Sequence, residues 1–346
     1  MRAIRLALML VLALAAGGCQ TVSFYTQAVG GQFEIWRKAR PIERVVTDNG
    51  TGAPLRERLQ AVARIREFAS RELALPDNGS YRAYADLGRR YVVWNVFAAP
   101  ALSLEPRQWC FPVAGCVAYR GYFSEADAEA FAARQRAKGD DVAVLGVPAY
   151  STLGWFDDPV LSTFIGLPEV ELAGLIFHEL AHQVAYVDDD TVFNESFAVT
   201  VELAGVDRWL SQHGTPAQRE AWAAGQERKR AFLALAARTR GQLDELYSSD
   251  AGEAAKRNGK AQIFAAMRAD YARLKAKWGG FSGYDAWLEE PLNNATLVPL
   301  ATYSVLVPGF QALLADQGGD LERFYAAVKA LAGRPPEERR LALSGG

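Results

Sequence analysis

The histidine pair His178 and His182 constrains the fold of this chain more than any other feature, because only three histidines occur in 346 residues and these two lie four apart. They belong to the segment LIFHELAHQVAYVDDDTVFNESFA, residues 175–198. Apolar residues around them recur at helical spacing, which predicts a half-buried helix. Residues four apart lie on one side of a helix, one turn above the other. Both imidazoles can therefore reach a single ion.

Glu195 can supply a third ligand from the next helix. The polar stretch VDDDT, residues 187–191, is turn-like, and Asp190 or Thr191 can cap a second helix that begins there. His182 lies about five residues before this turn and Glu195 about four after it, so two antiparallel helices bring them to a similar height. We predict that Glu195 completes a site with both histidines.

Two imidazoles and a carboxylate favour one zinc ion, with the fourth position open to water. Glu179 follows His178 and is offset around the helix, so it is poorly placed as a ligand but well placed to touch that water. This is the His-Glu-x-x-His pattern of zinc proteases. The alternative, two histidines that are only packed or solvated, is disfavoured by the matched Glu195. His213 precedes Gly214 and is expected to end a helix rather than to bind the ion.

The N-terminus has the composition of a secretory signal. Two arginines precede an apolar run over residues 6–16, and small residues precede Cys19. The apolar run is too short to span a membrane comfortably. The sequence AGGC, residues 16–19, resembles a bacterial lipobox, which implies cleavage before Cys19 and lipid on its thiol. An ordinary signal peptide with a chance cysteine is the alternative. By the same resemblance, Gln20 favours the outer membrane.

The two other cysteines, Cys110 and Cys116, lie close together in the sequence. In an exported chain an even remainder of this kind indicates a local disulfide. The loop that it closes is short, so the bond would stiffen a turn more than hold the fold. Two free, half-buried thiols are the alternative. Zinc binding by these cysteines is disfavoured, because no second pair of cysteines or histidines accompanies them.

The order of predicted elements indicates an α+β fold. We expect helices before Pro41 and over residues 54–73 and 124–138, with strands at 90–100, 115–123 and 141–147 and either a strand or an irregular edge at 149–156. From Pro168 the pattern is helical, with helices near 216–246, 251–277 and 319–333. The predicted divisions are a signal peptide at 1–18, a strand-rich part with the histidine helix at 19–190, and a mainly helical part at 191–340.

Composition excludes one class of partner. The formal net charge is −2 and charged residues make up 23% of the chain, without a basic block or stripe. Nucleic acid is therefore not an expected partner. The sequence indicates no particular protein partner.

Several segments resemble the putative aminopeptidases found as lipoproteins in Gram-negative bacteria, within the gluzincin class of zinc peptidases. These segments are FYTQAVGGQFEIWRKARPI, GCVAYRGYF, AYSTLGWFDDP, HELAHQ, FNESFA and LNNATLVPLATY, and they span nearly the whole mature chain. The resemblance implies a zincin-like fold, a peptide substrate, and a place in the cell envelope facing the periplasm, anchored by lipid on Cys19. Many gluzincins carry an acid four residues after the glutamate ligand; here Val199 occupies that position, which leaves Asp188, Asp189 or Glu202 to orient a histidine.

The resemblance also implies a mechanism, in which Glu179 takes a proton from a zinc-activated water and passes it to the leaving amine. The oxyanion needs a further donor, for which Tyr303 and Tyr150 are candidates. The segment AYSTLGWFDDP can serve as an edge strand that pairs with peptide backbone, or be purely structural.

Three functions remain open at the level of sequence. An aminopeptidase needs a carboxylate that is not a ligand to hold the substrate's α-ammonium group, and Glu171, Asp157 and Asp158 are candidates. An envelope endopeptidase would use the same zinc chemistry in an open groove. A non-catalytic zinc-binding lipoprotein would not need Glu179, which argues against it.

Overall fold

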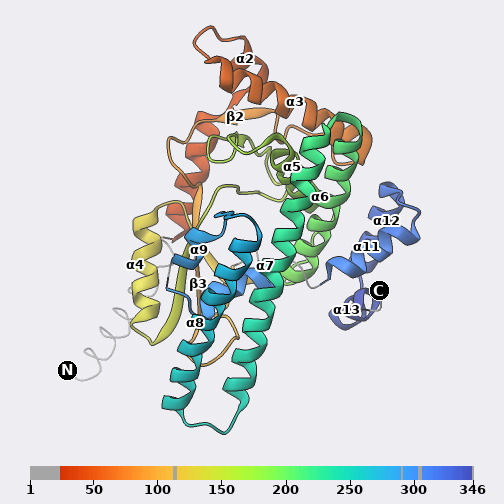
Figure 1. The fold of residues 1–346 in the computed structure, drawn as a ribbon. Coiled ribbons are helices and arrows are strands. Elements are labelled where there is room, and N and C mark those ends of the chain that lie inside the picture. The colour runs from red at the N-terminus through yellow and green to blue at the C-terminus, as the bar shows by residue number, and fades with distance from the viewer. Residues whose placement is uncertain (1–23, 112–114, 290, 303–305, 345–346) are drawn as a thin grey trace, which may run out of the picture.

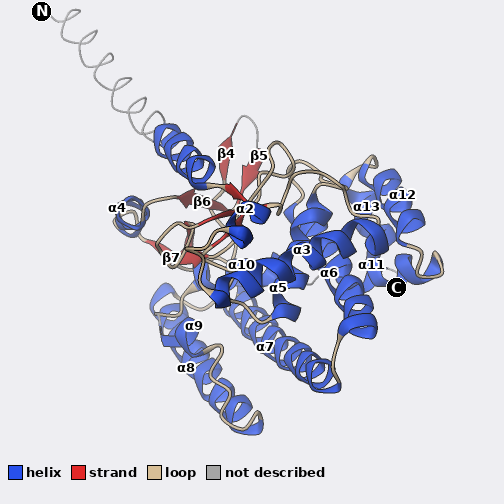
Figure 2. Cartoon of the chain, turned by 90° about the horizontal axis from the view of Figure 1, so that it is seen from above, coloured by secondary structure: helices blue, strands red, loops and turns tan. Residues whose placement is uncertain are grey.

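The computed structural model describes residues 24–111, 115–289, 291–302 and 306–344. It confirms an α+β fold, in which the strands precede helix α5 and helices fill the rest of the chain (Figure 1). Seen from above, the strands gather beside α4, and α11, α12 and α13 lie at the other end of the molecule (Figure 2).

The principal sheet has the strand order β6-β3-β7. Its central strand β3 (Val93–Pro100) pairs antiparallel with β6 (Tyr119–Tyr122) and with β7 (Asp140–Val147). Because side chains alternate along a strand, Val96 and Ala98 pack against helix α4 (Glu125–Arg136), while Phe97 packs on the opposite face against Ala295. Ser124 caps α4, since its side chain accepts a hydrogen bond from the backbone N–H of Asp127.

Two predicted strands differ from the structure. The strand expected at 115–123 is divided into β5 (Gly115–Val117) and β6, and β5 pairs with β4 (Trp109–Phe111) in a separate hairpin. Residues 148–159 contain no strand, so the irregular alternative is the one observed there. The reason is local. Leu153 and Gly154 have φ of 56° and 83°, and the Asp158 carboxylate accepts a hydrogen bond from the backbone N–H of Thr152, which folds the segment back on itself.

A small second sheet supports the start of the histidine helix. Strand β2 (Ala83–Ala85) pairs antiparallel with β1 (Arg40–Pro41) and parallel with β8 (Val160–Leu161). Helices α2 (Ile42–Thr47) and α3 (Ala53–Leu73) follow β1. Phe68 of α3 packs against Phe177 of α5, with ring centroids 6.0 Å apart. The main core is therefore built between α3, α5 and the helices that follow.

The second half of the chain is helical, as predicted. Its elements are α5 (Glu169–His182), α6 (Thr191–His213), α7 (Pro216–Ser248), α8 (Glu253–Lys277), α9 (Asp285–Glu289), the 3-10 helix η1 (Asn294–Leu297), α10 (Val298–Thr302), α11 (Val307–Asp316), α12 (Leu321–Ala332) and α13 (Pro336–Ser344). Helices α7 and α8 form a long hairpin that projects from the body (Figure 1) and has its own core around Phe232 and Met267. In the described part of the chain, no helix has the length and apolar character needed to cross a membrane.

Candidate metal centre

Helices α5 and α6 lie side by side because small residues let their backbones approach. A Cβ added to Gly205 of α6 would come within 2.7 Å of the Phe177 ring, and one added to Gly174 of α5 would come within 3.3 Å of Glu202. Asp190 caps α6, since its carboxylate accepts a hydrogen bond from the backbone N–H of Phe193. Thus Asp190, rather than Thr191, provides the cap.

The helix pair brings His178, His182 and Glu195 together. The Nε2 atom of His178 lies 3.3 Å from Glu195 Oε2, and the Nε2 atom of His182 lies 3.8 Å from Glu195 Oε1. One ligand atom from each of the three residues lies within 4.8 Å of the other two. Bonds of about 2.0–2.1 Å in a tetrahedral zinc site separate ligand atoms by about 3.3 Å. The three residues therefore fit a zinc ion with little rearrangement.

The second nitrogen of His178 contacts another carboxylate. Its Nδ1 atom lies 3.2 Å from Glu202 Oε2, so of the three acids considered from the sequence, Glu202 is the one that contacts a candidate ligand. Val199, where many gluzincins have an acid, is buried. Glu202 lies seven residues after Glu195, which is two helical turns, and therefore projects from the same side of α6. A carboxylate in this position orients the imidazole and leaves Nε2 available to a metal.

The surroundings of the two histidines shift their pKa values in opposite directions. Burial acts to lower the pKa of His178, but hydrogen bonds with Glu195 and Glu202 outweigh it and raise this pKa to about 10. Burial, together with the nearby charge of His178, lowers the pKa of His182 to about 4. The Nδ1 atom of His182 is buried without a hydrogen-bond partner among the described residues. His182 is thus held neutral, the form in which histidine binds a metal.

The Glu202→Gln variant is expected to bind zinc about 10–100-fold more weakly than the wild type. The amide oxygen accepts a hydrogen bond from His178 Nδ1–H more weakly than a carboxylate does, so the imidazole becomes a poorer and less well oriented ligand. Competition with a chromophoric chelator measures the affinity. Asp207→Asn, an exposed change on the same helix, is the control and should bind as the wild type does. Equal zinc affinity of Glu202→Gln and wild type would contradict this role.

Glu179 lies next to His178, among groups from the loop before α5. Burial is the main cause that raises its pKa to about 7; the charges of Glu195 and Asp158 add to this, whereas His178 and a hydrogen bond with Ser151 oppose it. A carboxyl group with a pKa near neutrality can both accept and release a proton at working pH. This pKa is compatible with the role of general base predicted from the sequence, and Glu179 is not among the three residues whose ligand atoms converge.

Of the three acids considered for holding an α-ammonium group, the structure brings Asp158 near Glu179. Glu171 and Asp157 are exposed, whereas Asp158 is 3% exposed. Its carboxylate accepts hydrogen bonds from the backbone N–H of Thr152 at 2.8 Å and from the Ser151 hydroxyl at 3.4 Å. These contacts hold the loop in its folded-back shape.

The stability of the protein should depend on the ionisation of Asp158. Burial raises the pKa of Asp158 to about 6 from a usual value of 3.8, while hydrogen bonds with Thr152 and Ser151 oppose the rise. A raised pKa favours folding while the group is protonated, below pH 4. This advantage is lost as the pH rises through about 6, at a cost on the order of 3 kcal/mol.

An asparagine at position 158 does not titrate. The free energy of unfolding of Asp158→Asn, relative to that of the wild type, should therefore rise by up to about 3 kcal/mol between about pH 4 and pH 7. Urea denaturation in the presence of a chelator measures the difference without a contribution from metal release. Asp157→Asn, the exposed neighbour, should show no such gain. Parallel pH profiles for Asp158→Asn and wild type would contradict the assignment.

Sequence reasoning missed three tyrosines near the centre. Burial and then the charge of Glu195 raise the pKa of Tyr119, and the same two causes lead the upward shift for Tyr186. The ring of Tyr186 lies 6.4 Å from that of His182. Tyr81 has φ of 61°, and burial, followed by the charge of Glu179, raises the pKa of its hydroxyl. The spacing of Tyr186, four residues after His182, was an available signal, but Tyr81 and Tyr119 come from distant segments.

The other predicted site residues have less connection to the centre. Tyr150 packs against Phe123, with ring centroids 5.6 Å apart, and burial followed by the charge of Asp158 raises its pKa. Tyr303 and Cys19 lie outside the residues that the structure describes. His213 ends α6 and packs against Trp209 at 4.4 Å, away from the three-residue group.

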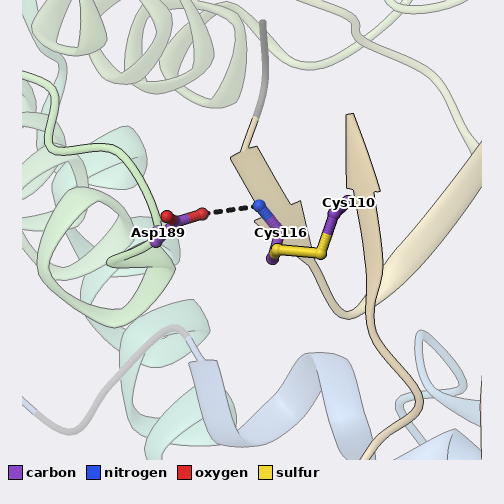
Figure 3. Close-up of a disulfide and its surroundings, with 3 residues drawn as sticks. All are labelled: Cys110, Cys116 and Asp189. Atoms are coloured by element: carbon purple, nitrogen blue, oxygen red, sulfur yellow. Dashed lines mark hydrogen bonds between the residues drawn. A yellow bond between two sulfur atoms is a disulfide. The ribbon is translucent and has the colours of Figure 1, made fainter. Parts of the chain in front are cut away.

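The connection between the two ligand helices is held by the disulfide hairpin. Cys110 and Cys116 are bonded to each other, and the backbone N–H of Cys116 donates a hydrogen bond to Asp189 Oδ1 at 2.5 Å (Figure 3). Gly115 has φ of 67°, and a Cβ there would lie 2.3 Å from the same carboxylate. Asp189 is in the connection that follows His182 and precedes Glu195, so the hairpin supports the relative placement of the candidate ligands.

Comparison with known proteins identifies one family. A family model described as "Putative aminopeptidase" matches residues 23–343, which is most of the chain. No curated protein and no solved structure matches.

Proposed function

This chain belongs to the putative aminopeptidase family, and from that premise we propose that it is a zinc-dependent peptidase that removes residues from the free N-terminus of peptides. His178, His182 and Glu195 hold the ion, and Glu179 is the general base. The observation that carries the proposal is the convergence of three ligand atoms within 4.8 Å of one another. If the two histidines of α5 were only packing residues, there would be no reason for the Glu195 carboxylate of α6 to lie beside both of them.

The chemistry divides between the ion and the protein. When bound, zinc lowers the pKa of a water molecule and polarises the scissile carbonyl. Glu179 accepts the proton of the attacking water and delivers it to the nitrogen of the leaving amine. Glu202 keeps the His178 ring oriented through Nδ1. Tyr119 and Tyr186 join Tyr150 and Tyr303 as candidate donors to the developing oxyanion.

Recognition of a free N-terminus requires negative charge beside the scissile bond. Asp158 is our candidate to contribute it, because the Ser151 hydroxyl contacts the Asp158 carboxylate and also interacts with Glu179. The carboxylate is buried and already accepts hydrogen bonds from its own loop. Its contribution is thus electrostatic attraction of an ammonium group, reinforced by Glu179 and Glu195.

Metal analysis and a pair of substrates test the proposal. Purified protein should contain about one zinc ion per chain, and a chelator should abolish hydrolysis. Peptides with a free N-terminus should be cleaved at their first bond, while the same peptides N-acetylated should survive. Cleavage of acetylated peptides at internal bonds would instead identify an envelope endopeptidase. A protein that binds zinc but cleaves neither set would be a non-catalytic zinc-binding lipoprotein.

We also propose that the protein works at the bacterial cell envelope. The support is the leader sequence, with its two arginines, apolar run and lipobox-like AGGC. Lipid on Cys19 would anchor the chain to the outer membrane with its catalytic part in the periplasm. A local disulfide suits that oxidising compartment.

A further inference from the structure

The first described helix carries an apolar stripe that faces away from the body. In residues 24–38, Tyr25, Val29, Phe33 and Trp36 are 39%, 69%, 61% and 41% exposed. Steps of four, four and three residues keep these side chains on one side of a helix. The helix lies at the edge of the molecule (Figure 2), and the described fold leaves the stripe largely exposed.

The opposite side of this helix is fixed to the body. Ile35 is 2% exposed, and a Cβ added to Gly31 would lie 2.1 Å from the Phe123 ring. The Gln27 side chain accepts a hydrogen bond from the backbone N–H of Phe123 at 2.9 Å. The helix therefore already has its buried face, and the exposed stripe is a second face presented in a defined direction.

A loop near the candidate metal centre extends the stripe. Trp155 and Phe156 are 72% and 48% exposed, and the Phe156 ring packs edge-on against Trp36 with centroids 4.5 Å apart. We call these six residues the aromatic face: Tyr25, Val29, Phe33, Trp36, Trp155 and Phe156. Nine large hydrophobic side chains are strongly exposed among the described residues, and six of them are in this face. Concentration of apolar side chains in one patch marks an interaction surface.

The chemistry and position of the aromatic face favour a lipid bilayer as its occupant. Tryptophan, tyrosine and phenylalanine are the side chains that favour the boundary between headgroups and acyl chains. Tyr25 follows Cys19 by six residues, a length of chain that spans about 20 Å at most. A chain anchored at Cys19 would thus keep the aromatic face at the bilayer surface. One lipid anchor holds a protein weakly, and a second apolar contact makes the attachment stable.

We propose that the aromatic face inserts into the headgroup–acyl boundary of a phospholipid bilayer, so that the helix over residues 24–38 lies along the membrane surface. The proposal is independent of the peptidase activity, and its choice of occupant rests on the lipid anchor at Cys19 proposed above. It has a consequence for that activity, because Trp155 and Phe156 follow Gly154, where an added Cβ would lie 3.2 Å from Gln183, the residue after His182. Docking by this face would hold the candidate metal centre close to the membrane surface.

Quenching of tryptophan fluorescence by brominated lipid tests the proposal. The full-length protein is reconstituted into phosphatidylcholine vesicles whose acyl chains carry bromine near the headgroup, with unbrominated vesicles as the reference. Wild-type emission should be quenched, and the quenched fraction should fall severalfold in Trp36→Phe/Trp155→Phe, which keeps the face apolar. The matched control is Trp222→Phe/Trp278→Phe on α7 and after α8, for which the quenched fraction should not fall.

A second pair of changes tests insertion with both reporter tryptophans in place. Val29→Ser/Phe33→Ser removes two strongly exposed apolar side chains, so the fold should persist by circular dichroism while quenching falls severalfold. Quenching that is absent in the wild type, or unchanged in Trp36→Phe/Trp155→Phe, would overturn the proposal. So would a concentration-dependent dimer that forms without quenching and is abolished by Val29→Ser/Phe33→Ser, because the occupant would then be a second copy of the chain.

Discussion

Glutamine in place of Glu179 is expected to lower kcat for peptide hydrolysis by about 10²–10⁴-fold, while the protein still binds about one zinc ion. Glutamine has the shape of glutamate but cannot take a proton from the attacking water. Zinc retention follows because Glu179 is not among the three residues whose ligand atoms converge. Single-turnover kinetics with metal analysis of the same preparation measures both quantities.

The exposed Glu171, on the same helix, supplies the matched control for this change. Glu171→Gln should keep both zinc and kcat, since it alters charge on α5 without touching the centre. A Glu179→Gln enzyme that turns over as fast as wild type would show that another group is the base. Loss of zinc together with loss of activity would show that Glu179 contributes to metal binding.

Glu195→Gln is expected to weaken zinc binding by more than about 100-fold. Loss of a carboxylate that only orients a ligand, such as Glu202, weakens metal binding by at most about that factor. Glu195 supplies the negative charge of the ligand set and contacts both imidazoles, at 3.3 and 3.8 Å. An amide retains the shape and loses the charge. The affinity for zinc should therefore be highest in the wild type, lower in Glu202→Gln and lowest in Glu195→Gln.

Thermal denaturation gives an independent measure of the same loss. Zinc at 100 times its dissociation constant stabilises a folded protein by about 2.7 kcal/mol, so the Tm of the wild type should rise as zinc is added. The Tm of Glu195→Gln should not respond over that range. A zinc-dependent rise equal to that of the wild type would remove Glu195 from the ligand set.

Local sequence patterns predicted most helices well because the determinants of a helix are local. Thr215 and Gln218 form a capping box at the start of α7, and the Ser124 side chain caps α4. Strands were predicted less well, since pairing partners lie far apart in the chain. The single strand expected at 115–123 is divided because its first part pairs with β4 and its second with β3.

The carboxylate next to His178 illustrates the limit of a motif. The position four residues after Glu195 is Val199, which is buried. The carboxylate that contacts Nδ1 of His178 is instead that of Glu202, two helical turns after Glu195. Both spacings lie on the same side of a helix, so helical periodicity could not choose between them. The relative height and rotation of α5 and α6 made the choice, and those depend on packing at Gly174 and Gly205.

The sequence by itself determined the candidate ligands and base, because a histidine pair one helical turn apart, an intervening glutamate and a glutamate just past the turn are set by local spacing. Only the tertiary structure decided which groups from distant segments surround them: Glu202, Tyr119, Asp158 and the disulfide hairpin at Asp189. It also revealed the aromatic face, since Trp36 and Phe156 lie 120 positions apart in the chain and meet at 4.5 Å. Spacing along a chain specifies contacts within one element, whereas contacts between elements depend on how their buried faces pack.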